Sequence, residues 1–233
     1  MRLQSRLIVL VALGAAGSTG GLAAQVAGLP VRNAGVGTGI GIAADVGFPN
    51  SASGKGIAFG ATGAIGLGPL GVTGSVATWN PKGPGPSVNS AGLTGNLKIF
   101  GGPLIPVSVT LQAGAAYSHQ SQSTIEGEIS SKTWHVPVGV GIALTIPNPV
   151  FSIKPWLAPR LDITRTAFNP GDTPTETNTD TRFGISGGVD FGFLSGLAAR
   201  VMYDRVKIGT DAPGGHGVNA SVLSVGLGFK VGT

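Results

Sequence analysis

The stretch GVGTGIGIAADVGF, residues 35–48, decides how this sequence folds. Its residues fall into two interleaved sets. The even positions carry mostly bulky apolar side chains, namely Val36, Thr38, Ile40, Ile42, Ala44, Val46 and Phe48. The odd positions carry glycine and alanine, with Asp45 as the one charge. A repeat of two residues is the side-chain period of a β-strand, so we expect a strand with a bulky face and a small face.

Glycines this dense also suggest a phosphate-binding loop, and one spacing comes close to the dinucleotide fingerprint. Gly39, Gly41 and Ala44 stand at the offsets that G-x-G-x-x-[GA] requires. That fingerprint needs a tight turn followed by a helix, whereas the two-residue alternation continues through these positions. The sequence therefore does not predict nucleotide binding here.

The same alternation recurs along the chain and predicts about ten strands, with eight as the alternative. They cover residues 35–48, 55–68, 70–80, 90–101, 107–119, 133–146, 151–165, 182–193, 197–209 and 220–232. Short connections alternate with long polar ones, which are residues 49–55, 81–89, 120–132, 169–181 and 210–217. This order indicates an all-β fold, an antiparallel up-and-down β-barrel with tight turns at one end and long loops at the other.

Three prolines conflict with this pattern. Pro137, Pro155 and Pro159 fall inside the expected strands, where each removes a hydrogen-bond donor. We expect them to mark bulges or strand ends.

The composition indicates that the barrel faces lipid. Only 11% of the 233 residues are charged, against about 25% in a typical globular protein. The second set of side chains is glycine, alanine, serine and threonine, which suit a narrow interior, while the bulky apolar set suits lipid. We therefore expect a transmembrane β-barrel with short periplasmic turns and longer extracellular loops. A soluble secreted β-protein is the alternative, because alternation alone does not say which face is wet.

The first 24 residues have the pattern of a secretory signal peptide, and residues 25–233 are expected to form a single barrel domain. Arg2 and Arg6 provide the positive start, residues 7–16 are apolar, and small residues follow. The chain has no cysteine, which excludes disulfides and a lipid-anchored lipoprotein. Because no run of Lys and Arg could follow a phosphate backbone, no nucleic-acid partner is expected.

On this pattern of strands and loops, residues 31–233 resemble the small outer-membrane β-barrel proteins of the opacity and outer-membrane-protein-A-like class. One departure is that Phe229 lies four residues from the C-terminus, whereas these barrels usually finish on an aromatic residue. The resemblance implies the outer membrane of a Gram-negative cell, with membrane lipid and the barrel-assembly machinery as partners. It also implies a non-enzymatic role, structural or adhesive, in which the loops contact an extracellular ligand. A narrow porin-like channel is the alternative.

Charged residues on the small face are expected to point into the barrel. They form an interior cluster of Asp45, Lys98, Arg160, Asp162, Arg182, Asp190, Arg200 and Asp204, joined by Lys154 and Lys230. Because both signs are mixed, we expect salt bridges that fill a narrow lumen, with a pore whose selectivity they tune as the alternative. The glycines of residues 35–48 leave room for long side chains, and Asp45 is expected to pair with one of the three arginines.

One short stretch raises an enzymatic alternative. His119 and Ser121 share a face of their strand, at the outer rim, and Glu126 and Glu128 follow closely. The arrangement is similar to the H-x-S motif of outer-membrane lipid A deacylases. That similarity implies His119 as the base, Ser121 as the nucleophile and either glutamate as the orienting acid.

The motif is incomplete, so the expectation is a polar loop without a catalytic site. The Asn and Ala that follow the serine in those deacylases are replaced by Gln122 and Ser123. No cofactor and no metal site are expected. His135 suits the interior, and His216 has no second ligand near it in the sequence.

Overall fold

The computed structural model describes residues 26–83, 85–102, 105–124, 127–148, 150–169, 175–193, 195–208 and 218–231. Its strands are β1 (Gly39–Pro49), β2 (Gly56–Leu67), β3 (Leu70–Pro81), β4 (Val88–Phe100), β5 (Val107–Thr124), β6 (Gly127–Leu144), β7 (Ile146–Pro147), β8 (Phe151–Asn169), β9 (Glu176–Phe193), β10 (Leu197–Ile208) and β11 (Val218–Val231). A single turn of 3-10 helix, η1 (Ser51–Ser53), joins β1 to β2. No helix in the described part is long and apolar enough to cross a membrane.

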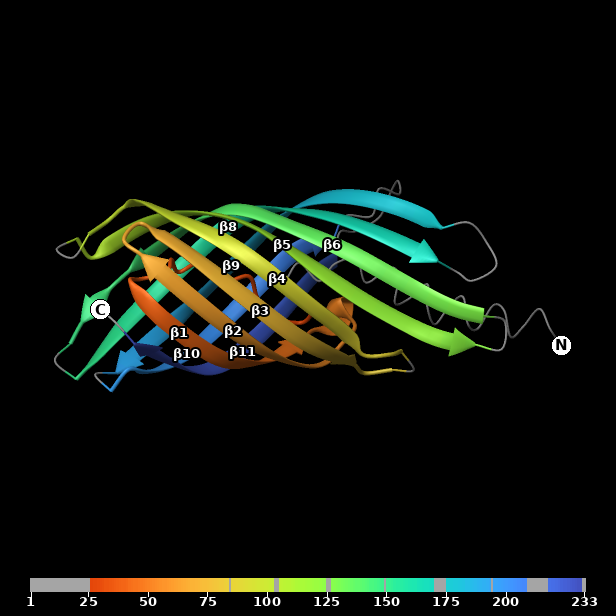
Figure 1. Ribbon diagram of the computed structural model, residues 1–233, viewed down its shortest axis with the longest axis horizontal. Coiled ribbons are helices and arrows are strands. Elements are labelled where there is room, and N and C mark those ends of the chain that lie inside the picture. Colours follow the sequence, from red (N-terminus) through yellow and green to blue (C-terminus); the bar gives the residue numbers. More distant parts are fainter. Residues whose placement is uncertain are drawn as a thin grey trace.

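The strands close into one barrel (Figure 1). Strands that follow one another in sequence pair antiparallel, except β6 and β7. In addition, β1 pairs with β11, and β8 pairs with both β6 and β7. Because β7 continues β6 beyond Thr145, the wall has ten strands in up-and-down order. The predicted antiparallel barrel of about ten strands is confirmed. Closure gives each edge strand a partner, as backbone groups in lipid require.

The two faces of the wall differ as the alternation predicts. Bulky apolar side chains on the outer face are exposed, for example Leu67 (73%) and Leu227 (72%). The inner face carries small and polar side chains, and many of these are buried, such as Ala58, Thr94 and Ser224. An outer surface this apolar suits a hydrocarbon surrounding rather than water.

The prolines do not mark bulges or strand ends, so that prediction is wrong. Pro155 and Pro159 lie within β8 and Pro137 lies within β6, and the register runs on past each of them. Instead, the β5–β6 ladder lacks two pairs beside Pro137, and the β6–β8 ladder lacks two pairs beside Pro159. A missing N–H thus removes local hydrogen bonds while the neighbouring pairs keep the strands aligned.

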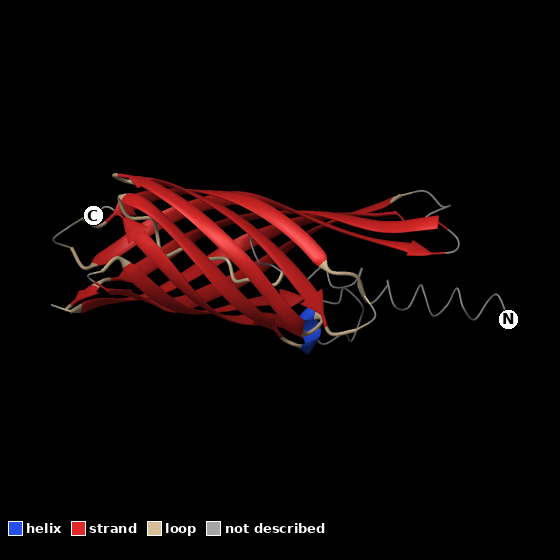
Figure 2. Cartoon of the chain, turned by 60° about the horizontal axis from the view of Figure 1, so that its bottom comes forward, coloured by secondary structure: helices blue, strands red, loops and turns tan. Residues whose placement is uncertain are grey.

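Four strands run past the others at the long-loop end (Figures 1 and 2). β5, β6, β8 and β9 have 18 or 19 residues, whereas about 9–11 residues cross a bilayer when tilted. Residues 120–124, 127–131 and 176–181 were expected in loops, yet they are strand. Serine and threonine in these polar stretches pair across the hairpins, as Ser121 does with Ser130, and threonine favours extended backbone.

Candidate functional site

The lumen holds a segment of the chain itself, residues 26–38, which we call the lumenal segment. The sequence predicted a strand from residue 35 with Val36 on the lipid face, and this part of the prediction is wrong. β1 begins at Gly39, and a Cβ built on inward-facing Gly71 would lie only 2.4 Å from the Val36 Cβ atom. Gly39 has a φ of +113°, a backbone conformation that glycine adopts readily and other residues rarely do. At this residue the chain leaves the lumen and enters the wall.

Hydrogen bonds tie the lumenal segment to several sides of the wall. The Ala27 N–H donates to Ser90 Oγ of β4 at 2.9 Å. The Val31 N–H donates to Asp204 Oδ2 of β10 at 2.9 Å. From β5, Gln112 Nε2 donates to the carbonyl oxygen of residue 32 at 2.9 Å. Polar main-chain groups that would be costly to bury thus have partners.

The glycines of the inner wall make room for this backbone. A Cβ on Gly47 would lie 2.2 Å from the Gly28 carbonyl oxygen, and one on Gly141 would lie 2.1 Å from the Asn33 carbonyl oxygen. Gly60 and Gly66 meet the segment equally closely. The sequence predicted that glycines leave space for arginines, whereas at these four positions the space is taken by the lumenal segment.

One ion-pair network lies deep in the wall. Arg160 Nε donates to Asp162 Oδ1 and its Nη2 donates to Asp204 Oδ1, both at 2.9 Å. His135 Nε2 lies 2.9 Å from the same Asp162 oxygen. All four side chains are buried, and Asp204 also accepts from the Val31 N–H. The network therefore joins β6, β8 and β10 to the lumenal segment.

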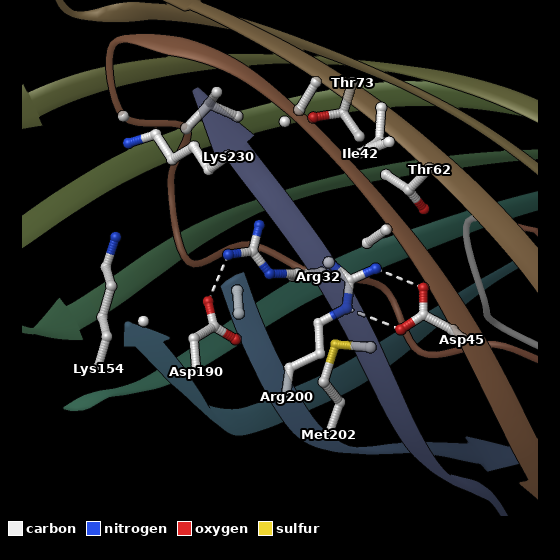
Figure 3. Close-up of a pocket in the computed structure, with 18 of the residues that line it drawn as sticks. Arg32, Ile42, Asp45, Thr62, Thr73, Lys154, Asp190, Arg200, Met202 and Lys230 are labelled. Atoms are coloured by element: carbon white, nitrogen blue, oxygen red, sulfur yellow. Dashed lines mark hydrogen bonds and ion pairs between the residues drawn. The ribbon is translucent and has the colours of Figure 1, made fainter. Parts of the chain in front are cut away.

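A second set of pairs lies nearer the short turns (Figure 3). Arg200 Nε donates to Asp45 Oδ1 at 2.7 Å, with a second contact between Nη2 and Oδ2. Arg32 of the lumenal segment pairs with Asp190, which also accepts from Trp156 Nε1 at 3.3 Å. Of the three arginines named as candidates for Asp45, the structure selects Arg200.

Three lysines lie at the short-turn end of the lumen. Lys154 and Lys230 line a cavity of about 290 Å³, and Lys98 lines a smaller neighbouring one together with Lys154. In the part of the chain that the structure describes, none of the three side chains forms an ion pair or hydrogen bond. The remaining interior arginine, Arg182, pairs with Asp180 towards the long loops.

Several residues of this interior were not among the predicted site residues. Arg32 and Asn33 were missed because they precede the alternating pattern that identified the wall. Asp180 was missed because its polar stretch was taken for a loop. The sequence did contain one indication that residues 26–34 are packed against the barrel. Apolar residues recur there, namely Val26, Leu29, Val31 and Ala34, and in the structure all four are buried.

Among the described residues, the candidate catalytic side chains are not joined to one another by hydrogen bonds. His119 and Ser121 share the outer face of β5, but no hydrogen bond joins them in the described residues, and His119 Nδ1 has no partner. Glu128 lies opposite Ser123, and Glu126 lies outside the described residues. The described part also holds no group of three or more metal-ligating side chains that could bind a metal ion.

A closed antiparallel barrel with an apolar outer surface and a polar interior defines an integral outer-membrane protein. The sequence matches the family described as outer membrane protein beta-barrel domain over residues 9–230. The chain therefore belongs to this family and is a protein of the cell outer membrane, so the soluble alternative is wrong. No curated protein matches the sequence.

The chain is similar to several solved barrels at low identity. The β domain of the Bordetella autotransporter Brka is 13% identical with a TM-score of 0.51, over 84% of this chain and 100% of that one. Ail, the attachment invasion locus protein of Yersinia pestis, is 12% identical with a TM-score of 0.38, over 84% and 100%. The outer membrane protease OmpT of Escherichia coli is 12% identical with a TM-score of 0.45, over 83% and 94%.

Proposed function

We propose that this barrel is a non-enzymatic surface-attachment protein that binds an extended segment of an extracellular protein. The binding surface is the projecting sheet, defined as residues 120–124 of β5, 127–131 of β6, 166–169 of β8 and 176–183 of β9. The observation that carries the proposal is the open edge of β9. β10 pairs with β9 only from Gly184 onward, so among the described residues 176–183 have a partner strand on one side alone, β8.

The chemistry of this edge favours pairing with another strand. Thr177, Thr179 and Thr181 are exposed, and their β-branched side chains favour extended backbone. Residues 176–183 contain no proline and no lysine, two of the residue types that protect an exposed edge. An edge of this kind can take up an extended peptide as an added strand, with main-chain hydrogen bonds providing the affinity.

The alternatives find less support in the geometry. A porin-like channel needs an open lumen, whereas residues 26–38 and two sets of ion pairs occupy this one. A lipid-modifying enzyme needs its base in hydrogen-bond reach of its nucleophile, and His119 and Ser121 are not so arranged.

The test uses the full barrel in lipid nanodiscs, panned against short random peptides displayed on phage. We expect enrichment of threonine-, valine- and isoleucine-rich peptides over empty nanodiscs. One of the variants Asn178→Pro and Thr179→Pro should lose this binding, because N–H groups of successive residues point to opposite sides of a strand and one of the two prolines therefore removes a donor from the open edge. Thr179→Val keeps the N–H group and is the matched control that should still bind. No enrichment, or binding that survives both prolines, would overturn the proposal.

A further inference from the structure

An aromatic pair lies on the outer face of the barrel, towards its long-loop end. Tyr117 of β5 and Trp134 of β6 lie directly opposite each other, with ring centroids 5.2 Å apart. Both belong to the outward-facing set of their strands, and Trp134 is 52% exposed. Tyrosine and tryptophan on the outer face gather where hydrocarbon meets the headgroups.

Basic side chains lie around this aromatic pair on the same outer face. His119, the next outward residue of β5, is directly opposite Lys132 of β6. Arg165 of β8 is directly opposite Trp134. Directly opposed residues have Cβ atoms about 4.5–5.5 Å apart and diagonal neighbours about 7–8 Å apart. The three basic side chains therefore belong to one patch, with Lys132 diagonal to Arg165.

The charge of this patch is not balanced by the protein. In the described residues, His119, Lys132 and Arg165 form no ion pair and no side-chain hydrogen bond. The acidic group of β6 on the same face is Glu128, two outward positions beyond Lys132. The interior shows the opposite behaviour, because its arginines are held against carboxylates.

We infer that His119, Lys132 and Arg165 bind the phosphate group of an outer-leaflet glycolipid, with its acyl chains beside Tyr117 and Trp134. A lipid is the occupant because these side chains point away from the barrel, at the depth where headgroups begin. Arginine binds phosphate through its planar fork and lysine as a point charge, and both prefer an anionic partner to an unpaired position at the interface. Placing a cationic side chain near the membrane surface costs little free energy. The contact with the lipid phosphate therefore determines how much these side chains contribute.

This inference gives His119 a role that differs from the catalytic one. As a phosphate ligand it needs neither Ser121 nor a carboxylate, and it acts beside Lys132. It is also independent of the projecting sheet, since the lipid site and the open edge of β9 use different residues.

The test measures binding of bisphosphorylated lipid A to the purified full-length barrel in detergent micelles. The variant Lys132→Gln/Arg165→Gln should bind about tenfold more weakly or worse, since it loses two charge-assisted contacts. With lipid A that lacks its phosphates, the wild-type and variant proteins should bind alike. Lys55→Gln/Lys82→Gln removes the same charge from loops at the same end of the barrel, and it should bind as the wild type does.

Retained heat-modifiable gel migration would show that each variant is folded. Equal binding of bisphosphorylated lipid A by the wild type and the Lys132→Gln/Arg165→Gln variant would overturn the inference. So would equal weakening by the Lys55→Gln/Lys82→Gln control, since the attraction would then be a general effect of charge. The inference would also be overturned if the wild-type protein bound phosphate-free lipid A as strongly as bisphosphorylated lipid A.

Discussion

Arg200 of β10 reaches across β11 to Asp45 of β1, and Gly226 stands between them. Gly226 is directly opposite Asp45 on one side and directly opposite Arg200 on the other. A Cβ built on Gly226 would lie 2.1 Å from Asp45 Oδ1, the oxygen that accepts from Arg200 Nε at 2.7 Å. The ion pair exists because the residue beneath it has no side chain.

The first prediction follows from this arrangement. Gly226→Ala should destabilise the folded barrel by about 1–3 kcal/mol, since its methyl group displaces the carboxylate from the arginine. Urea unfolding in lipid vesicles, followed by tryptophan fluorescence, measures the change. The control is Gly41→Ala, on the same inner face, where the nearest atom to a new Cβ is 3.7 Å away. Equal effects of the two variants would show that the pair tolerates the methyl group.

The Asp45 pair also shows how far the sequence could predict this interior. Alternation places Asp45 on the small face and the arginines on the same face of their own strands. It does not give the stagger between strands that decides which arginine lies level with Asp45. That stagger depends on where each strand begins, and the polar residues 120–132 and 169–181 concealed the ends of four strands.

The lumenal segment was beyond the reach of strand periodicity. Residues 26–34 have no repeat of two, because their side chains meet a wall that surrounds them, and residues 35–38 do alternate but lie in the lumen rather than in the wall. What the sequence did hold was an excess of glycine on the inner face. That excess was explained by arginine side chains, yet Gly47 and Gly141 show that backbone can need the same space. Glycines on the inner face therefore predict that other atoms fill the space beside them, but they do not predict whether those atoms belong to side chains or to backbone.

The buried ion-pair network around Arg160 should contribute more to the stability of the barrel than the Arg182–Asp180 pair near the long loops. Asp204→Asn loses one of two strong acceptor contacts, to Arg160 or to the Val31 N–H, and leaves a buried guanidinium under-compensated. We expect about 3–5 kcal/mol of destabilisation. Asp180→Asn is the matched control, because the Asp180 side chain is 40% exposed, and such pairs contribute about 1 kcal/mol or less. Thermal unfolding of both variants in micelles measures the difference, and equal losses would contradict it.

Serine 121 should have no chemical role. We expect the lipid A of cells that produce the Ser121→Ala variant to have the same mass spectrum as that of cells producing the wild type. Both should match cells without the protein, because His119 is not hydrogen-bonded to Ser121. Loss of an acyl chain in the wild-type sample alone would restore the deacylase hypothesis.

The last prediction concerns what closes the lumen. If residues 26–38 fill it, deleting residues 26–34 while keeping residues 1–25 should produce steady ion conductance in planar bilayers, where the intact barrel is closed. Arg32→Gln weakens the link to Asp190 but keeps the backbone contacts of Ala27 and Val31, so it should give at most brief openings. The wall of the deleted protein has the same ten strands, and heat-modifiable migration would show that it has folded. A folded but silent deletion variant would mean that the interior ion pairs close the barrel by themselves. Conductance that appears only after deletion assigns that task to the lumenal segment, and the glycines of the wall would then be explained by the backbone they accommodate.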